Sequence, residues 1–275
     1  MKVITLIENR TISKEYKCKH GLSLYIETSN HKILFDTGTD DSFVYNACKL
    51  GVNLEDIDIA VISHGHYDHG GGLEVFLKYN SKAKIYIGKD AFDRHLIKLF
   101  GIIKYSIGLK KKLISNNRLI FVDEMMKIDD ELILFGNVKG DKLIPKGNDR
   151  LLKESSNGLV EKDDFEHEIS LLINENDKYS LFCGCAHKGI VNIIERTKDI
   201  IDSDLNTVIG GFHLMGMKTN NATSKDFLDD LSNILGNNNI DKYYTCHCTG
   251  EQPYSYLSQK MRNLDELKTG KVIEI

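Results

Sequence analysis

The sequence lacks the features that would assign it to a membrane or to a nucleic acid. No apolar run approaches the length of a membrane span, and Glu8 interrupts the N-terminal segment before an apolar region of signal-peptide length can form. The formal net charge is −4, so there is no basic excess to attract a phosphate backbone or an anionic lipid surface. We therefore expect a cytoplasmic protein without a nucleic-acid or membrane partner. Nothing in the sequence indicates its oligomeric state.

The six cysteines show none of the Cys-x-x-Cys spacing that is common in structural zinc sites. Four of them form two Cys-x-Cys pairs, Cys183/Cys185 and Cys246/Cys248. A chain of this size without a secretory signal is expected to keep its thiols reduced. We interpret the pairs as small apolar side chains at two strand ends. A sulfur-ligated metal centre, or redox-sensitive thiols beside a metal, are the alternatives.

The chain is long enough to bury a substantial core. Of its 275 residues, 41% are hydrophobic and 28% charged, which is ordinary for a globular protein. Strand patterns alternate with helical patterns in both halves, without a linker or a short repeat, so we expect one α/β domain over residues 1–275 with helices outside a strand-built core. The patterns predict a long loop at Gly136–Glu161 and helices at Ser42–Leu50, Leu73–Tyr79, Lys89–Phe100, Ile190–Lys198, Ser224–Leu235 and Pro253–Met261.

The most informative segment follows a strand that should be buried on both faces. The apolar run Ile57–Ile62 is closely followed by four side chains that can bind a metal: His64, His66, Asp68 and His69. A glycine triplet, residues 70–72, then lets the backbone turn tightly before a helix. Imidazole and carboxylate suit zinc, iron or manganese, and packing gives no reason to place four such groups in one loop. The segment therefore predicts a metal site.

Single histidines follow apolar strands further along the chain. His187 and His247 stand between small or turn-forming residues that let the backbone approach a metal, so we expect both to be ligands. For His213, a metal ligand and an ordinary structural histidine are equally open. Strand ends of an α/β protein cluster on one rim, which would bring these histidines to the first cluster.

Other polar residues carry weaker signals. Lys188 stands at the start of a helix, where it would help to bind an anionic substrate, although a surface lysine is the simpler interpretation. His167 precedes a strand and is a candidate for substrate contact. His31 in a turn and His95 on the expected helix 89–100 should have surface roles.

These motifs together resemble the metallo-β-lactamase superfamily. The resemblance rests on His64-x-His66-x-Asp68-His69, on Asp36-Thr37-Gly38 upstream and on the single histidines downstream. More particular segments resemble the branch of metal-dependent hydrolases that are similar to 7,8-dihydropterin-6-yl-methyl-4-(β-D-ribofuranosyl)aminobenzene 5'-phosphate synthase. These segments are residues 21–23, 34–38, 184–190, 210–214 and 247–250.

The resemblance implies a four-layer αβ/βα sandwich with two divalent metal ions at one edge, zinc being expected and manganese or iron the alternatives. One ion would be held by His64, His66 and His187, and the second by Asp68, His69 and His247. Asp36 would orient a ligand histidine through its ring N–H. Many relatives carry a carboxylate between the two ions, where this chain has Gly211-Phe212-His213. Filling of the second site would then depend on whether His213 substitutes.

The missing carboxylate has an electrostatic consequence. Two divalent ions bring about four positive charges, against one negative charge from Asp68 and one from a bridging hydroxide. The remaining surplus of about two positive charges favours a small anionic or phosphorylated substrate. We expect a metal-dependent hydrolase, or a related transferase or synthase, in which Asp68 orients and deprotonates a water and His213 donates a proton to the oxyanion or leaving group.

A different class of function is also open. A non-catalytic or redox sensor with the same fold would keep the metal but lack turnover. The complete set of four ligands in the first cluster argues against it, because a degenerate site usually loses ligands. A nuclease of the same superfamily would need a basic surface, which the net charge does not supply.

Overall fold

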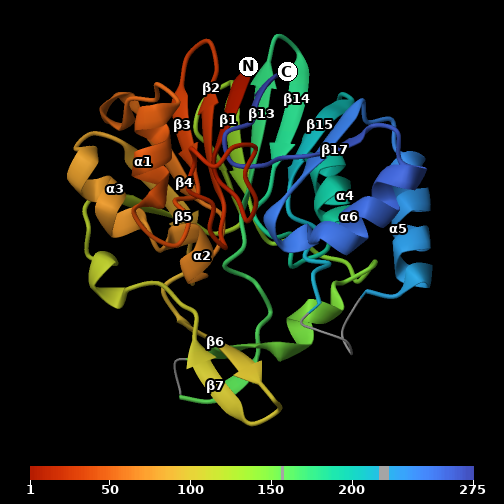
Figure 1. The fold of residues 1–275 in the computed structure, drawn as a ribbon. Helices are drawn as coiled ribbons and strands as arrows, with labels where there is room; N and C mark the ends of the chain where they lie inside the picture. Colours follow the sequence, from red (N-terminus) through yellow and green to blue (C-terminus); the bar gives the residue numbers. More distant parts are fainter. Residues whose placement is uncertain (156–157, 217–222) are drawn as a thin grey trace.

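Two sheets of seven strands form the centre of the molecule (Figure 1). The computed structural model describes residues 1–155, 158–216 and 223–275. The first sheet has the strand order β18-β1-β2-β3-β4-β5-β8, and the second has the order β17-β16-β15-β14-β13-β10-β9. Both chain ends lie side by side at the same end of the two sheets, where the amine of Met1 donates to the carbonyl of Ile275 at 2.9 Å.

The first sheet is built from the N-terminal half of the chain and its last strand. Strands β1, β2 and β3 pair antiparallel, whereas β3, β4, β5 and β8 run parallel to one another. The carboxyl ends of β3 and β4 therefore lie at the same edge. The strands are β1 (Lys2–Ile7), β2 (Ser23–Glu27), β3 (Lys32–Phe35), β4 (Ile59–Ile62), β5 (Lys84–Gly88), β8 (Leu119–Val122) and β18 (Val272–Glu274).

The second sheet is built from the C-terminal half. Strands β9, β10, β13 and β14 pair antiparallel, and β14, β15, β16 and β17 run parallel. The carboxyl ends of β14, β15 and β16 therefore also share an edge. The strands are β9 (Met125–Lys127), β10 (Leu132–Phe135), β13 (Ser170–Glu175), β14 (Lys178–Phe182), β15 (Leu205–Gly210), β16 (Lys242–Thr245) and β17 (Leu264–Glu266).

Alternating side chains of the strands divide the molecule into layers. In β3, Ile33 and Phe35 join the core between the two sheets, whereas Leu34 joins the core beneath the helices. In β4, Val61 likewise joins the core between the sheets, and Ile62 joins the core beneath the helices. Successive strand side chains point to opposite faces, so each sheet is buried on both sides and needs helices outside it. The predicted four-layer αβ/βα sandwich is confirmed.

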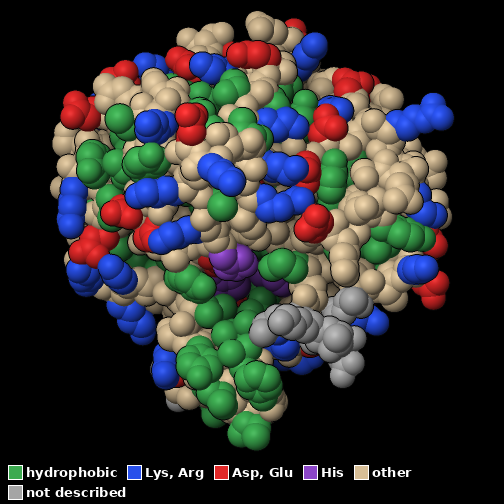
Figure 2. Space-filling view, in the orientation of Figure 1, with side chains coloured by type: hydrophobic (Ala, Val, Ile, Leu, Met, Phe, Trp, Pro, Cys, Tyr) green, Lys and Arg blue, Asp and Glu red, His purple; other side chains and the backbone are tan. Residues whose placement is uncertain are grey.

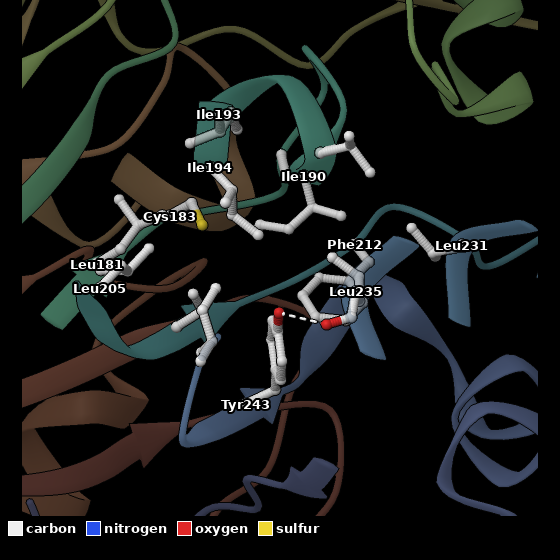
Figure 3. Close-up of a cluster of buried hydrophobic side chains, with 14 of the residues drawn as sticks. Leu181, Cys183, Ile190, Ile193, Ile194, Leu205, Phe212, Leu231, Leu235 and Tyr243 are labelled. Atoms are coloured by element: carbon white, nitrogen blue, oxygen red, sulfur yellow. Dashed lines mark hydrogen bonds between the residues drawn. The ribbon is translucent and has the colours of Figure 1, made fainter. Parts of the chain in front are cut away.

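Helices cover the outer face of each sheet (Figure 1). The first sheet is covered by α1 (Ser42–Lys49) and α3 (Leu73–Tyr79), and the second by α4 (Ile190–Ile200), α5 (Lys225–Gly236) and α6 (Glu251–Lys260). Figure 3 shows the core beneath the second group, where the Tyr243 hydroxyl donates to the Leu235 carbonyl at 2.9 Å. Among the described residues, no helix has both the length and the apolar composition needed to cross a membrane.

A third, four-stranded sheet forms a lobe below the sandwich (Figure 1). Exposed apolar side chains gather on this lobe, among them Phe100, Ile102 and Tyr105 (Figure 2). The strands, in the order β12-β11-β6-β7, are β6 (Arg94–Leu99), β7 (Ile103–Ser106), β11 (Leu151–Glu154) and β12 (Val160–Lys162).

Two predictions from the sequence were wrong in this lobe. The expected helix Lys89–Phe100 is instead a turn followed by strand β6, because residues of β6 such as His95 pair with the distant β11 at Lys153. Such non-local pairing overrides a local helical pattern. The expected long loop Gly136–Glu161 contains a short 3-10 helix, Lys146–Arg150, and also β11, which forms through the same non-local pairing.

Candidate metal centre

Strands of both sheets end at one edge, and the residues that follow them are polar. Asp36 follows β3, and Ser63 and His64 follow β4. In the second sheet, the segments after β14 and β16 carry His187 and His247. The parallel strands of each sheet bring these carboxyl ends to the edge between the sheets. Figure 2 shows histidine side chains in a hollow of the surface, next to the apolar lobe.

A short helix, α2 (Tyr67–Gly70), positions Asp68 and His69. The glycines that follow it serve a different purpose from the one expected. Gly71 and Gly72 have φ angles of −63° and −79°, which other residues adopt readily. A Cβ on Gly71 would instead clash with the backbone of Thr39. The glycines therefore let the segment after β3 pack directly against α2.

Asp68, His69 and His247 form one group of candidate ligands. Asp68 Oδ2 lies 3.2 Å from His247 Nε2 and 3.9 Å from His69 Nε2. Bonds of about 2.0–2.2 Å to zinc place two ligand atoms of a tetrahedral site about 3.4 Å apart. The spacing of this group therefore suits one ion.

His64, His66 and His187 form a second group. The ring centroid of His64 lies 4.6 Å from that of His66 and 4.9 Å from that of His187, and the last two are 5.0 Å apart. The three ring planes stand at 76° to 81° to one another. The His64 ring also lies 4.1 Å from the His69 ring, so the two groups are adjacent.

Buried ring nitrogens in these groups have no hydrogen-bond partner among the described residues. An unpaired polar atom in the interior is unfavourable and calls for an explanation. A metal ion bound by the nitrogen lone pairs provides one, and imidazole nitrogen is a common ligand of divalent zinc. The donor set therefore fits a metal ion. The atoms without a hydrogen-bond partner are Nε2 of His64, His66 and His187, whereas His247 Nε2 faces Asp68 Oδ2 at 3.2 Å.

The opposite nitrogens of two histidines are held by asparagines. Asn148 Oδ1 lies 2.9 Å from His187 Nδ1, and the Asn148 amide donates to the His187 carbonyl at 2.7 Å. Asn9 makes the same pair of contacts with His247, at 2.9 Å and 3.1 Å. An oxygen acceptor at Nδ1 fixes the proton there and leaves Nε2 free to bind a metal.

Asp36 and Ser63 hold the histidines of the first sheet. Asp36 Oδ2 accepts from His69 Nδ1 at 2.6 Å and from the Ser63 hydroxyl at 2.8 Å. Asp36 Oδ1 accepts from the Ser63 backbone N–H at 2.7 Å. Because the Ser63 hydroxyl gives its proton to Asp36, its oxygen accepts from His64 Nδ1 at 2.9 Å. Asp36 therefore orients both rings from their Nδ1 side, directly at His69 and through Ser63 at His64.

Two buried glutamates fix the backbone of the histidine loops. Glu168 accepts from the N–H groups of His187 and Lys188 at 2.7 Å and 2.9 Å. Glu8 accepts from the N–H of His247 at 2.7 Å. Burial raises the pKa of both glutamates. These contacts hold each histidine loop against the end of a neighbouring strand.

The electrostatics of the site suit metal binding. Burial lowers the pKa of His64 and His187 well below the ordinary value, and neighbouring histidines add to the effect. Both rings are therefore neutral at neutral pH, which is the form that binds metals. Burial alone would raise the pKa of Asp68, but the neighbouring His69 ring and the contacts with His20 and His247 hold it well below its ordinary value. Asp68 is therefore a carboxylate.

Two residues of the site were not predicted. His20 Nε2 lies 3.2 Å from Asp68 Oδ2, and nothing in the irregular sequence around His20 indicates this contact. Cys185 Sγ lies 3.2 Å from His69 Nε2. Its position two residues before His187 was a signal, but the sequence favoured an apolar role.

The weaker candidates have different surroundings. The His213 ring lies 4.2 Å from the His187 ring and is partly exposed, so it borders the site. Lys188 Nζ donates to Glu166 at 2.8 Å, and this ion pair offsets its charge. His167 is only 1% exposed, which leaves it out of reach of a substrate in this structure.

His167 belongs to a buried cluster behind His66. Asp163 Oδ2 lies 3.0 Å from His95 Nδ1 and 3.3 Å from His167 Nε2. The other nitrogen of His167 accepts from the Gly65 N–H at 3.0 Å. The expectation of a surface role for His95 was wrong, since strand β6 buries it to 1% exposure against Asp163.

Comparison with known proteins places this site in a family. The model of the metallo-beta-lactamase superfamily matches residues 17–140, which include the segment from His64 to His69. An uncharacterized protein of Methanocaldococcus jannaschii, MJ0448, is 30% identical over 275 residues, which are 99% of this chain and 100% of that protein. The chain belongs to the metallo-beta-lactamase superfamily.

Two further proteins match along the whole chain. The 7,8-dihydropterin-6-methyl-4-(beta-D-ribofuranosyl)-aminobenzene-5'-phosphate synthase of Methanocaldococcus jannaschii is 27% identical over 292 residues, covering 100% of this chain and 96% of the synthase. The crystal structure of Tm1679, a metal-dependent hydrolase of the beta-lactamase superfamily, has a TM-score of 0.83 and 27% identity, covering 100% of this chain and 99% of Tm1679. Membership of the superfamily supports a metal-dependent function like that of a hydrolase or a synthase.

Proposed function

We propose that this chain is a metal-dependent hydrolase, or a related transferase or synthase, that binds two divalent ions and acts on a small anionic substrate. The proposal rests mainly on the buried Nε2 atoms of His64 and His187, which have no hydrogen-bond partner among the described residues, and on Nε2 of His247, which faces the Asp68 carboxylate at 3.2 Å. Each of these rings is held through its other nitrogen. That arrangement is unfavourable unless a cation binds, and zinc is the metal that best suits these donors.

The residues of the site divide the chemical work between them. Divalent ions bound there would supply a water activated near neutral pH and polarise the electrophilic group of the substrate. Asp68, which lies 3.2 Å from the ring nitrogens of His20 and His247, would hold the water and accept its proton. His213, partly exposed beside His187, would donate a proton to the oxyanion or leaving group.

The substrate class follows from the charge of the centre. With Asp68 as the one carboxylate among the expected ligands, a two-ion centre that also holds a hydroxide keeps about two positive charges. The name of the related synthase describes a product with a 5'-phosphate, which supports a phosphorylated substrate. Lys188 contributes little to this preference because Glu166 pairs with it. We therefore favour phosphate or carboxylate substrates over neutral ones.

A panel of paired substrates tests this proposal. Each pair contains a phosphorylated ester and its neutral analogue, assayed with the metal-loaded protein and again after chelation. We expect turnover of the phosphorylated member to be at least about tenfold faster, and we expect chelation to abolish it. Faster cleavage of neutral esters or lactones would overturn the substrate class. A metal-loaded protein without turnover on any member would instead favour a sensor.

A pair of histidine variants provides the control. His187→Ala removes a candidate ligand. It should abolish metal-dependent turnover and lower the metal content of the protein. His31→Ala removes a histidine that contacts Asp58 and Asp129 at 3.2 Å and 2.8 Å. His31 precedes β3, whereas the candidate site lies at the opposite end of that strand. The His31→Ala variant should leave turnover unchanged. Equal loss in both variants would show that the effect is one of stability.

A further inference from the structure

Cys185 occupies the position between the two groups of candidate ligands. Its loop connects β14 to α4 and also carries His187. We propose that the Cys185 sulfur is a shared ligand of the two metal ions and takes the place of the carboxylate that the chain lacks after β15. This inference rests on the proposed two-ion function and adds to it a specific sulfur ligand.

The distances around Cys185 support a shared ligand. Its sulfur lies within 4.8 Å of the ligand atoms of His64 and His187, and also within 4.8 Å of those of His69 and His247. Within the described residues, Cys185 is the one side chain that clusters both with His64 and His187 and with His69 and His247. A sulfur at about 2.3 Å and a nitrogen at about 2.0 Å from one tetrahedral zinc ion are about 3.5 Å apart. The separation of 3.2 Å from His69 Nε2 is close to that value.

The unpartnered nitrogens give independent support. Nε2 of His64 and His187 on one side is buried without a partner among the described residues, and Nε2 of His247 on the other side faces the Asp68 carboxylate at 3.2 Å. All three belong to the groups that contain Cys185. The sulfur therefore lies among buried histidine nitrogens whose arrangement is explained by a bound cation. A thiolate is a strong ligand of zinc.

The neighbouring cysteines have other surroundings. Cys183 lies in the same loop, but its sulfur points into the apolar core among Leu181 and Ile194 and contacts the Ile209 carbonyl at 3.7 Å (Figure 3). Cys248 lies 3.6 Å from the Cys185 carbonyl and groups with Cys185 and His213 instead of with either set of histidines. Cys183 is the matched control because it is a buried cysteine in the apolar core, and Cys248 is the rival sulfur ligand that the test must distinguish from Cys185.

A shared thiolate changes the charge and the metal preference of the centre. It adds one negative charge, so the surplus falls from about two positive charges to about one. The centre still favours an anionic substrate. Because sulfur is a soft ligand, the site should prefer zinc or cobalt over magnesium or manganese.

Cobalt substitution tests the assignment directly. The full chain is stripped of metal and loaded with Co²⁺, and the near-ultraviolet region is examined for thiolate-to-cobalt charge transfer. We expect this absorption in the wild type and in Cys183→Ala and Cys248→Ala, and its loss in Cys185→Ala. Cys185→Ala should also bind the more weakly held ion at least about tenfold less tightly, as measured by competition with a chelator.

X-ray absorption of the zinc-loaded wild type covers the case in which Cys185→Ala fails to fold. We expect a zinc–sulfur distance of about 2.3 Å in addition to nitrogen and oxygen ligands. Two bound ions without a sulfur signal would overturn the assignment of Cys185 and leave the proposed function standing. A sulfur signal that disappears in Cys248→Ala but not in Cys185→Ala would overturn it as well. A wild type that binds no ion would overturn the proposed function itself.

Discussion

Asp36→Asn tests how the site holds a histidine ready for its metal. Asp36 is fully buried and accepts three hydrogen bonds, two from Ser63 at 2.7 Å and 2.8 Å and one from His69 Nδ1 at 2.6 Å. Asparagine has the same shape, and its oxygen can still accept from the Ser63 backbone. Its amide N–H groups would then face both His69 Nδ1 and the Ser63 hydroxyl, where acceptors are needed.

The magnitude follows from the proton on His69. To accept from the amide, the ring must move its proton from Nδ1 to Nε2, and a protonated Nε2 cannot bind a metal. Loss of such an orienting partner typically costs 10- to 100-fold in metal affinity, which is about 1.4–2.7 kcal/mol. Replacing the charged acceptor should also lower the free energy of unfolding of the metal-free protein by about 1.5–3 kcal/mol.

Competition with a chromophoric chelator measures the affinity of each ion, and urea unfolding of the metal-free protein measures the stability. Asp58→Asn is the matched control, because Asp58 also contacts a histidine, His31, at 3.2 Å but is partly exposed. We expect Asp58→Asn to bind both ions like the wild type. If Asp36→Asn also kept wild-type affinity for both ions, the orienting role of Asp36 would be refuted.

The remaining predictions concern the water, the loop packing and the pH. Asp68→Ala should abolish turnover while the metal-free protein still unfolds in one cooperative transition, and near-full turnover would contradict its role as the base. Gly184→Ala would bring a Cβ to 2.7 Å from Ser63 Cβ and should lower the free energy of unfolding by about 1–3 kcal/mol, whereas wild-type stability in urea would refute the close packing. The metal-free protein should lose stability as the pH falls below about 6.5, because the lowered pKa of the buried His64 and His187 means that the unfolded chain takes up protons which the folded chain does not. Each ring contributes up to about 1.4 kcal/mol per pH unit, and urea midpoints that do not change between pH 7.5 and 5.5 would contradict this.

Local patterns in the sequence were sufficient to predict much of this site. The buried strand β4 followed by His64 to His69 is contiguous, and its chemistry can be interpreted without knowledge of the fold. Parallel strands then place His187 and His247 on the same edge by a general rule of α/β proteins. The position of Asp36 beside His69 depended on the family resemblance, since no local pattern links the two.

The supporting contacts could not be predicted, because they join distant parts of the chain. Asn9 meets His247 across 238 positions, and asparagine in an irregular segment has no distinguishing pattern. Strand β6 of the lobe could not be predicted for the same reason, since it pairs with β11, which lies far away in the sequence. Cys185 was interpreted as an apolar side chain. Cysteine occurs both in apolar cores and at metal sites, so its residue type alone does not distinguish the two roles.

A metal count on the purified protein tests the central claim most directly. Native mass spectrometry of the zinc-loaded wild type should show two ions per chain. His187→Ala and His247→Ala each remove a ligand from a different group, so each variant should retain one ion. A wild type with one ion or none, or variants that both keep two, would contradict the two-ion centre.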